Sequence, residues 1–143
     1  FCFDSIDEPV CEDIVLHIQS DTTNGNTNIQ NLATQSIGST VTNSQYGESP
    51  VHSTQRSLFG ASSLLFNGTN NYFHIGDQTD FKFLHDSTSD YTIETWFFPD
   101  AAPPVSQALM TNMSGTSNSN GIYYIIRNSG NNGGLDIEYN III

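Results

Sequence analysis

Basic residues are scarce in this sequence, in which three Lys and Arg stand against fifteen Asp and Glu and give a net charge of −12 over 143 residues. Arg56, Lys82 and Arg127 are too few to neutralise a run of phosphates, so we expect neither nucleic acid nor an anionic membrane as a partner. An acidic surface that is poor in Lys and rich in Asn, Ser and Thr is more typical of extracellular proteins than of cytosolic enzymes.

Long apolar runs and cysteines are scarce as well. No apolar run approaches the roughly 20 residues that span a bilayer, and the opening residues FCFDSIDEPVC include neither a Met nor a signal peptide. We therefore expect a mature product or an excised portion, with residues 1–12 as an N-terminal leader. Cys2 and Cys11 are too few for a disulfide framework. A bond between them would contribute about 2 to 3 kcal/mol in an oxidising compartment, and two reduced thiols are an equal alternative.

Helical periodicity is also absent, apart from one turn predicted around Phe81. Apolar and polar residues instead alternate in short segments separated by Gly, Pro, Asn and Ser, a pattern typical of β-strands. The predicted strands are 13–19, 39–43, 62–66, 72–75, 91–98, 107–112, 121–127 and 135–143. The segment NGTNN at 67–71 predicts a hairpin between its flanking strands, and NSGNNGG at 128–134 predicts another. So many short strands in a chain of one-domain length predict an all-β fold, an antiparallel two-sheet sandwich.

The one Trp lies in the strand predicted over residues 91–98, YTIETWFF. Alternate residues of a strand point to opposite faces, and here both rows contain aromatic side chains. We therefore expect a central strand that is covered on both sides and ended by Pro99. The predicted core consists of Leu16, Leu64, Phe66, Ile93, Trp96 and Ile125.

Three segments, in order, carry a resemblance to a known family: VLHIQSD, SLFGASSLLFNGTNNYFHI and DFKFLHDSTSDYTIETWFFPD. Together they resemble the laminin G-like jelly rolls of the concanavalin A-like lectin and glucanase superfamily, in the version found in phage and marine microbial surface proteins. The resemblance covers about residues 13 to 139 and implies a jelly-roll sandwich over 13–143. The family's later WHHVA-like strand and closing strands do not appear, so we expect a domain truncated on its C-terminal side.

Catalysis is the first chemistry that this resemblance raises, because the related glucanases use carboxylates on one strand face as nucleophile and general acid. Asp136 and Glu138 share a face, but Gly134 stands where those enzymes carry a further Glu, which favours a solvated acidic face. The four histidines, His17, His52, His74 and His85, have no ligand-like spacing, and no G-x-S-x-G motif is present. We expect no catalytic residues and no enzyme activity.

Calcium is the one cofactor to consider. The segment DTTNGN at 21–26 lacks the alternating oxygen ligands and the closing Glu of a calcium loop, and Asn67 stands where the family usually has Asp. A calcium site, the alternative to no cofactor, would be formed by Asp21, Asn67 or Asp77.

Composition and resemblance together indicate a non-catalytic surface display module, a phage decoration or fibre domain that mediates adhesion or carbohydrate binding on an extracellular or virion surface. Exposed aromatic residues near loop tips would bind the ligand, with Tyr46, Tyr72 and Tyr123 as the candidates. The expected partners are other virion or surface-assembly subunits and cell-surface glycans. Two alternatives remain open: a purely structural assembly or cement component, and a glycoside hydrolase of the glucanase type.

Overall fold

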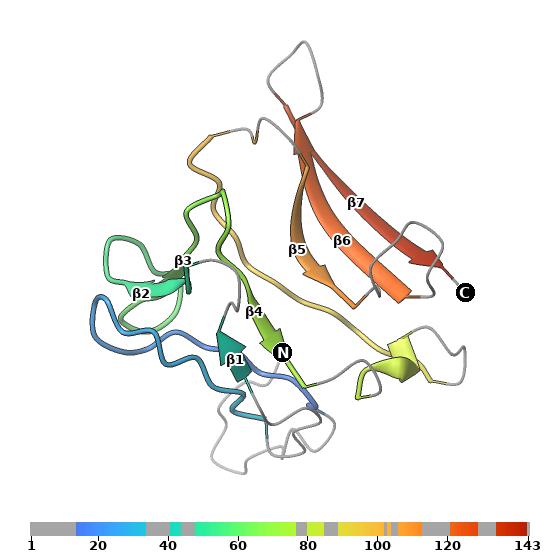
Figure 1. The fold of residues 1–143 in the computed structure, drawn as a ribbon, viewed down its shortest axis with the longest axis horizontal. Helices are drawn as coiled ribbons and strands as arrows, with labels where there is room; N and C mark the ends of the chain where they lie inside the picture. Colours follow the sequence, from blue (N-terminus) through green and yellow to red (C-terminus); the bar gives the residue numbers. More distant parts are fainter. Residues whose placement is uncertain are drawn as a thin grey trace. The chain divides into compact units, whose positions relative to one another are not determined.

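The fold in Figure 1 is that of a computed structural model, which describes residues 14–33, 41–43, 48–76, 80–84, 89–101, 103, 106–112, 121–128 and 134–142. The chain divides into two compact units, Phe1–Asp77 and Gln78–Ile143. All pairings between named strands are antiparallel, and no α-helix occurs in the described ranges. The all-β prediction is confirmed.

The first unit contains two small sheets. Strand β1 (Val41–Asn43) pairs with β4 (Phe73–Ile75), and β2 (Val51–Ser53) pairs with β3 (Ser63–Leu65). The predicted hairpin between residues 62–66 and 72–75 is therefore wrong, because these two segments pair in different sheets. In the intervening loop the backbone N–H groups of Thr69, Asn70 and Asn71 donate to Oδ1 of Asn67 rather than to an opposite strand.

Residues 14–33 cross the first unit with little regular structure. The strand predicted over 13–19 is reduced, in the described residues, to one isolated bridge between Ile18 and Asn31. The segment is held to β2 instead, because Gly25 donates its N–H to the carbonyl of His52 at 2.8 Å and His52 donates to that of Asn26 at 2.8 Å. Ile29 is buried, whereas Leu16 of the predicted core is only half-buried.

A series of hydrogen bonds around the buried side chain of His52 connects separate segments of this unit. The side chain of His52 is 3% exposed, and its Nε2 lies 3.0 Å from the carbonyl of Asn28, which can only accept, so Nε2 carries a proton. In the neutral ring, Nδ1 then accepts from the hydroxyl of Ser20 at 2.6 Å. Ser62 lies 2.8 Å from Ser20 and accepts the N–H of Thr22 at 3.1 Å. These bonds tie residues 20–28 to β2 and to the start of β3.

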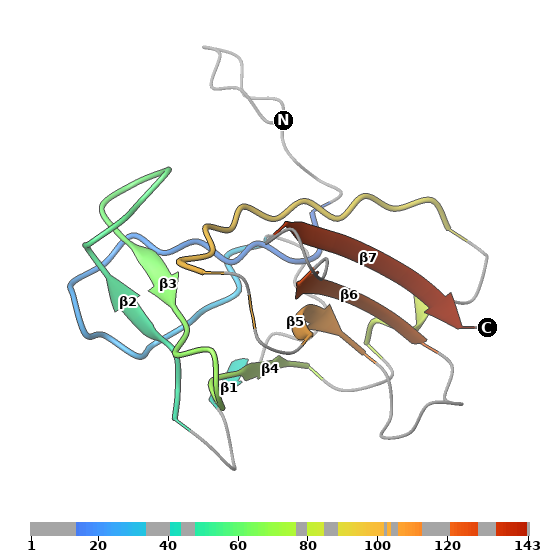
Figure 2. The same ribbon diagram turned by 90° about the horizontal axis from the view of Figure 1, so that it is seen from above.

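The second unit is built on a three-stranded sheet of order β5-β6-β7. Its strands are β5 (Gln107–Thr111), β6 (Gly121–Asn128) and β7 (Leu135–Ile142), which lie side by side in Figure 2. The register between β5 and β6 shifts between Ala108 and Met110, and β6 pairs with β7 over its whole length. These strands and the second predicted hairpin pairing are confirmed, although the turn residues 129–133 lie outside the described residues.

The core of the second unit combines the central strand with a short 3₁₀ helix, η1 (Lys82–Leu84), at the turn predicted around Phe81. The buried apolar side chains are Phe81, Leu84, Ile122, Ile125 and Ile126. Asn112 joins the two elements, since its Oδ1 accepts the N–H of Ile122 at 2.7 Å and its Nδ2 donates to the carbonyl of Phe81 at 3.4 Å. Ile125 thus occupies the core as predicted.

The prediction that residues 91–98 form a central, doubly covered strand is wrong. These residues are extended but belong to no sheet, and Trp96 is 64% exposed and Phe98 67% exposed. Without a neighbouring strand on each side, alternation alone does not bury either row of side chains. Phe66, which is 46% exposed, is also wrongly placed in the predicted core, while Leu64 and Ile93 are half-buried.

Candidate ligand-binding face of the three-stranded sheet

Alternation along β6 and β7 gathers polar side chains on one face of the sheet. In the antiparallel register Tyr123 pairs with Asn140, Ile125 with Glu138, and Arg127 with Asp136, so these residues share a face. Apart from the buried Ile125, the side chains are a phenol, a guanidinium, two carboxylates and a carboxamide. We call Tyr123, Arg127, Asp136, Glu138 and Asn140 the polar face.

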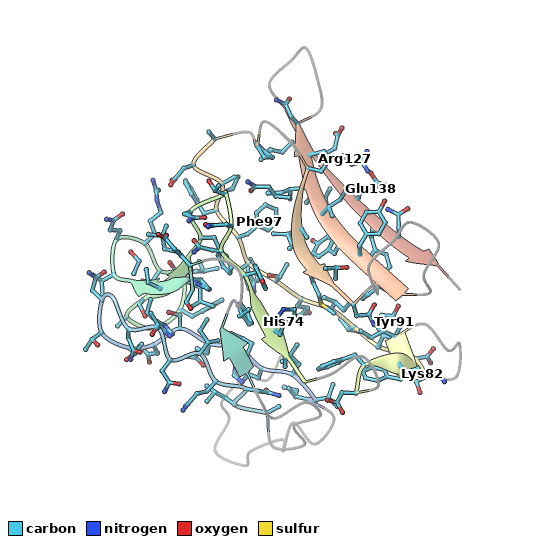
Figure 3. The ribbon with its side chains drawn as sticks, in the orientation of Figure 1. His74, Lys82, Tyr91, Phe97, Arg127 and Glu138 are labelled. Carbon is cyan, nitrogen blue, oxygen red and sulfur yellow. The ribbon has the colours of Figure 1, made fainter. Side chains whose placement is uncertain are left out.

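Glu138 lies at the centre of the polar face. Its Oε2 is 2.8 Å from Nη2 of Arg127, and its Oε1 accepts from Nδ2 of Asn140 at 2.7 Å and from the hydroxyl of Tyr123 at 3.2 Å. Figure 3 shows Arg127 and Glu138 next to each other on β6 and β7. Three donors from two strands therefore fix the carboxylate in one orientation.

The ion pair is partly open to solvent, with 44% of the Arg127 side chain and 35% of the Glu138 side chain exposed. Because water screens such a pair, its contribution to stability is small, about 1 kcal/mol or less. Within the described residues, Nε of Arg127 is buried without a hydrogen-bond partner. Asp136 is exposed at the rim of the face. The polar face thus offers donors and acceptors in a fixed arrangement at the surface.

The groups of the polar face are of kinds that can bind a hydroxyl-rich ligand. Carboxylate, carboxamide and guanidinium groups can each bind a hydroxyl or a pair of hydroxyls in their plane, and a phenol adds an aromatic ring. A glycosidase needs one carboxyl group as acid and another as nucleophile or base. On the polar face Glu138 is bound by three donors, and the second carboxyl group is that of the exposed Asp136.

The opposite face of β7 carries a tyrosine pair. The hydroxyl groups of Tyr91 and Tyr139 are 2.5 Å apart, and the ring of Tyr139 meets that of Tyr124 edge to face at 6.3 Å. Desolvation of the hydroxyl, followed by its hydrogen bond to Tyr91 and the charge of that group, raises the pKa of Tyr139 to about 12. Tyr139 remains 44% exposed, so this pair lies at the surface.

Of the predicted ligand-binding tyrosines, the structure places Tyr123 on the polar face. Tyr72 lies in the first unit, half-buried, with its ring edge to face with His74 at 5.1 Å. Tyr46 lies outside the described residues. Arg127 and Asn140 are the polar-face residues that sequence reasoning missed, although their even spacing from Tyr123 and Glu138 on the predicted strands was a signal for them.

The predicted calcium ligands have other partners. Asp21 accepts the N–H of Ala61 at 2.7 Å. Asn67 accepts three backbone N–H groups at Oδ1, which identifies that atom as the oxygen, and its Nδ2 donates to Glu48 and Asn70.

The N–H₂ group of Asn67, which cannot ligate a cation, thus faces the oxygens of Glu48 and Asn70. Asp77 lies outside the described residues, among which no cluster of three His, Cys, Asp or Glu suited to a metal occurs. The segment of Cys2 and Cys11 is likewise outside them.

No model of a known protein family, no curated protein and no solved structure matches this chain. Within the described ranges, none of the helical structure is long and apolar enough to cross a membrane.

Proposed function

We propose that the protein is a non-catalytic surface display module that binds carbohydrate through the polar face of β6 and β7. The observation that carries the proposal is the fixing of Glu138 by Arg127, Asn140 and Tyr123. Groups held in place before binding lose little conformational entropy when a ligand arrives, which favours recognition.

The setting of this module is the outside of a phage virion or a similar assembly, as a decoration or fibre domain. The laminin G-like resemblance supports this setting and a concanavalin A-like jelly roll of two sheets. A net charge of −12 supports it too, because strongly acidic surfaces stay soluble and resist non-specific association. Cell-surface glycans are the ligands that an adhesion domain in this position would meet.

A purely structural role in assembly is the second candidate. It is favoured by the exposed aromatic residues of the extended segment, Trp96 and Phe98, and by Ile137, which is 55% exposed on β7. Large exposed apolar side chains are a common feature of surfaces that other subunits cover. A glucanase-type hydrolase is the third candidate and rests only on the shared face of Asp136 and Glu138.

The test is binding of the intact chain to a panel of immobilised glycans. We expect at least one glycan to be retained, and Asn140→Ala and Tyr123→Phe to weaken that binding about tenfold, the effect of losing one hydrogen bond. Tyr72→Phe in the first unit is the matched control and leaves binding unchanged. A chain that binds no glycan but sediments as a complex with virion proteins would support the structural role instead. Release of reducing sugar, abolished by Glu138→Gln, would support the hydrolase.

A further inference from the structure

The sequence contains four Asn-Gly pairs, at Asn24, Asn67, Asn120 and Asn132. In such a pair the backbone nitrogen of the glycine can attack the amide carbon of the preceding side chain, because glycine has no side chain to obstruct the approach. Asn120 and Asn132 lie outside the described residues, so the structure allows a comparison of Asn67 with Asn24.

The side-chain oxygen of Asn67 is surrounded by donors. Its Oδ1 accepts the backbone N–H groups of Thr69, Asn70 and Asn71 at 2.9, 3.1 and 3.3 Å. When a nucleophile attacks the amide carbon, negative charge develops on this oxygen. Donors already aimed at that position stabilise the transition state more than the ground state. The loop also holds Gly68 at a φ of 71°, a left-handed conformation that glycine adopts readily.

The side-chain nitrogen of Asn67, the leaving group of such a reaction, lies beside a carboxylate. Nδ2 is 3.3 Å from Oε2 of Glu48 and 2.8 Å from Oδ1 of Asn70. The carboxylate of Glu48 accepts the N–H of this nitrogen, so its negative charge stabilises the positive charge that develops on the nitrogen as it takes up a proton and leaves. Residues 66–70 are also exposed, which gives water access to the product.

Asn24 has a different environment. The N–H of Gly25 donates to the carbonyl of the buried His52 at 2.8 Å. The Oδ1 of Asn24 accepts one N–H from the described residues, that of Thr54 at 3.2 Å. The oxygen of Asn24 therefore accepts fewer N–H groups from the described residues than that of Asn67.

We propose that Asn67 is a site of self-catalysed deamidation. The Gly68 nitrogen forms a bond to Cγ of Asn67, the bond from Cγ to Nδ2 breaks, and ammonia leaves with the proton of the Gly68 amide. One water molecule then opens the five-membered imide and leaves aspartate or isoaspartate at position 67. Water enters and ammonia leaves, and no oxidation or reduction takes place.

The reaction has a structural consequence in the same loop. A carboxylate at position 67 cannot donate, so the bonds from Nδ2 to Glu48 and Asn70 are lost and oxygen atoms face one another instead. A second negative charge beside Glu48 adds repulsion. Deamidation of Asn67 therefore loosens the loop that connects β3 to β4, and it makes the net charge of the chain one unit more negative.

The test is incubation of the folded chain in mildly alkaline buffer made with oxygen-18 water, followed by digestion and peptide mass spectrometry. We expect the label and the mass change at Asn67 to appear on the order of tenfold faster than at Asn24, well below the effect of one buried oxyanion donor in an enzyme. Asn67 also converts faster in the folded chain than in the same chain in denaturant, where all four pairs react alike.

Glu48→Gln is the matched variant, since it keeps an oxygen near Nδ2 but removes the negative charge beside the leaving nitrogen. It slows conversion at Asn67 in the folded chain and leaves the rate in denaturant unchanged. A rate at Asn67 in the folded chain that equals or falls below its rate in denaturant would overturn the proposal. An unchanged rate in Glu48→Gln would overturn the role given to that carboxylate.

Discussion

Arg127 and Glu138 form a diagonal contact across β6 and β7, in which Nη2 lies 2.8 Å from Oε2 although Arg127 is paired in register with Asp136. Side chains one step off register on a sheet face are within reach of long residues such as arginine. The contact leaves Asp136 exposed and gives the carboxylate of Glu138 a fixed orientation. Two carboxylates that the sequence makes look equivalent are thus placed in different environments.

Replacing Glu138 by Gln should lower the free energy of unfolding by about 1 kcal/mol or less, because the pair is screened by water. The amide still offers an oxygen to Asn140, so the loss reflects the ion pair. Urea unfolding at low and high salt measures the effect, which shrinks as salt is added. Asp136→Asn is the control, and a loss as large as that of Glu138→Gln would show that the contact with Arg127 has no special role.

The tyrosine pair predicts a dependence of stability on alkaline pH. The folded-state pKa of Tyr139 is raised from 10.0 to about 12, so the folded protein keeps a proton that the unfolded chain has lost. The stabilisation is therefore fully present below pH 10 and is lost as pH rises toward 12. Phenolate absorbance measured against pH should show one late-titrating tyrosine, which returns toward 10.0 in Tyr91→Phe. A titration of Tyr139 that is unchanged in Tyr91→Phe would exclude that partner, since desolvation alone would then raise the pKa.

Removing the imidazole of His52 should be costly. His52→Ala leaves Ser20 without its acceptor and the carbonyl of Asn28 without its donor, in a region where His52 is 3% exposed. We expect a loss of about 2 to 3 kcal/mol in the free energy of unfolding of the first unit. His17→Ala at an exposed position should change it by less than about 0.5 kcal/mol. Equal losses of unfolding free energy in His52→Ala and His17→Ala would contradict the stabilising role given to the hydrogen bonds of His52.

Two glycines with positive φ form a matched pair. A Cβ at Gly60 would lie 2.8 Å from Cγ and Oδ1 of Asp21, whereas a Cβ at Gly25 would meet nothing within 4 Å. Gly25→Ala should therefore cost about 1 to 2 kcal/mol from backbone strain alone. Gly60→Ala should cost more, because it also displaces Asp21 from the N–H of Ala61. Thermal unfolding of both variants checks the order, and a smaller loss for Gly60→Ala would contradict it.

The sequence predicted the second unit better than the first, and the reason is local. Residues 121–127 and 135–143 alternate clearly and are joined by a turn rich in Gly and Asn, so neighbours in sequence pair in space. Residues 62–66 and 72–75 are also neighbours, but their partners are β2 and β1, which no local pattern specifies. The partner of a strand is decided by tertiary packing.

For the candidate site too, local sequence patterns predicted some residues, and others depend on the tertiary structure. Tyr123 and Glu138 could be found from strand alternation, and Arg127 and Asn140 follow once the β6 and β7 register is known. The contact of Tyr91 with Tyr139 joins residues 48 apart and depends on the path of an extended segment that forms no strand. The aromatic residues at 91–98 were predicted to lie in the core because they occur in both alternating rows of side chains. A strand is buried, however, only where other parts of the chain cover it on both sides.

The central claim is that the polar face binds carbohydrate, and backbone amide NMR of the intact chain tests it most directly. A soluble oligosaccharide chosen from the glycan panel is titrated into the labelled protein. We predict shifts that saturate and are confined to residues near Tyr123, Arg127 and 136–140, and that disappear in Asn140→Ala. Shifts centred on another part of the chain, or no shifts with any glycan of the panel, would contradict the account.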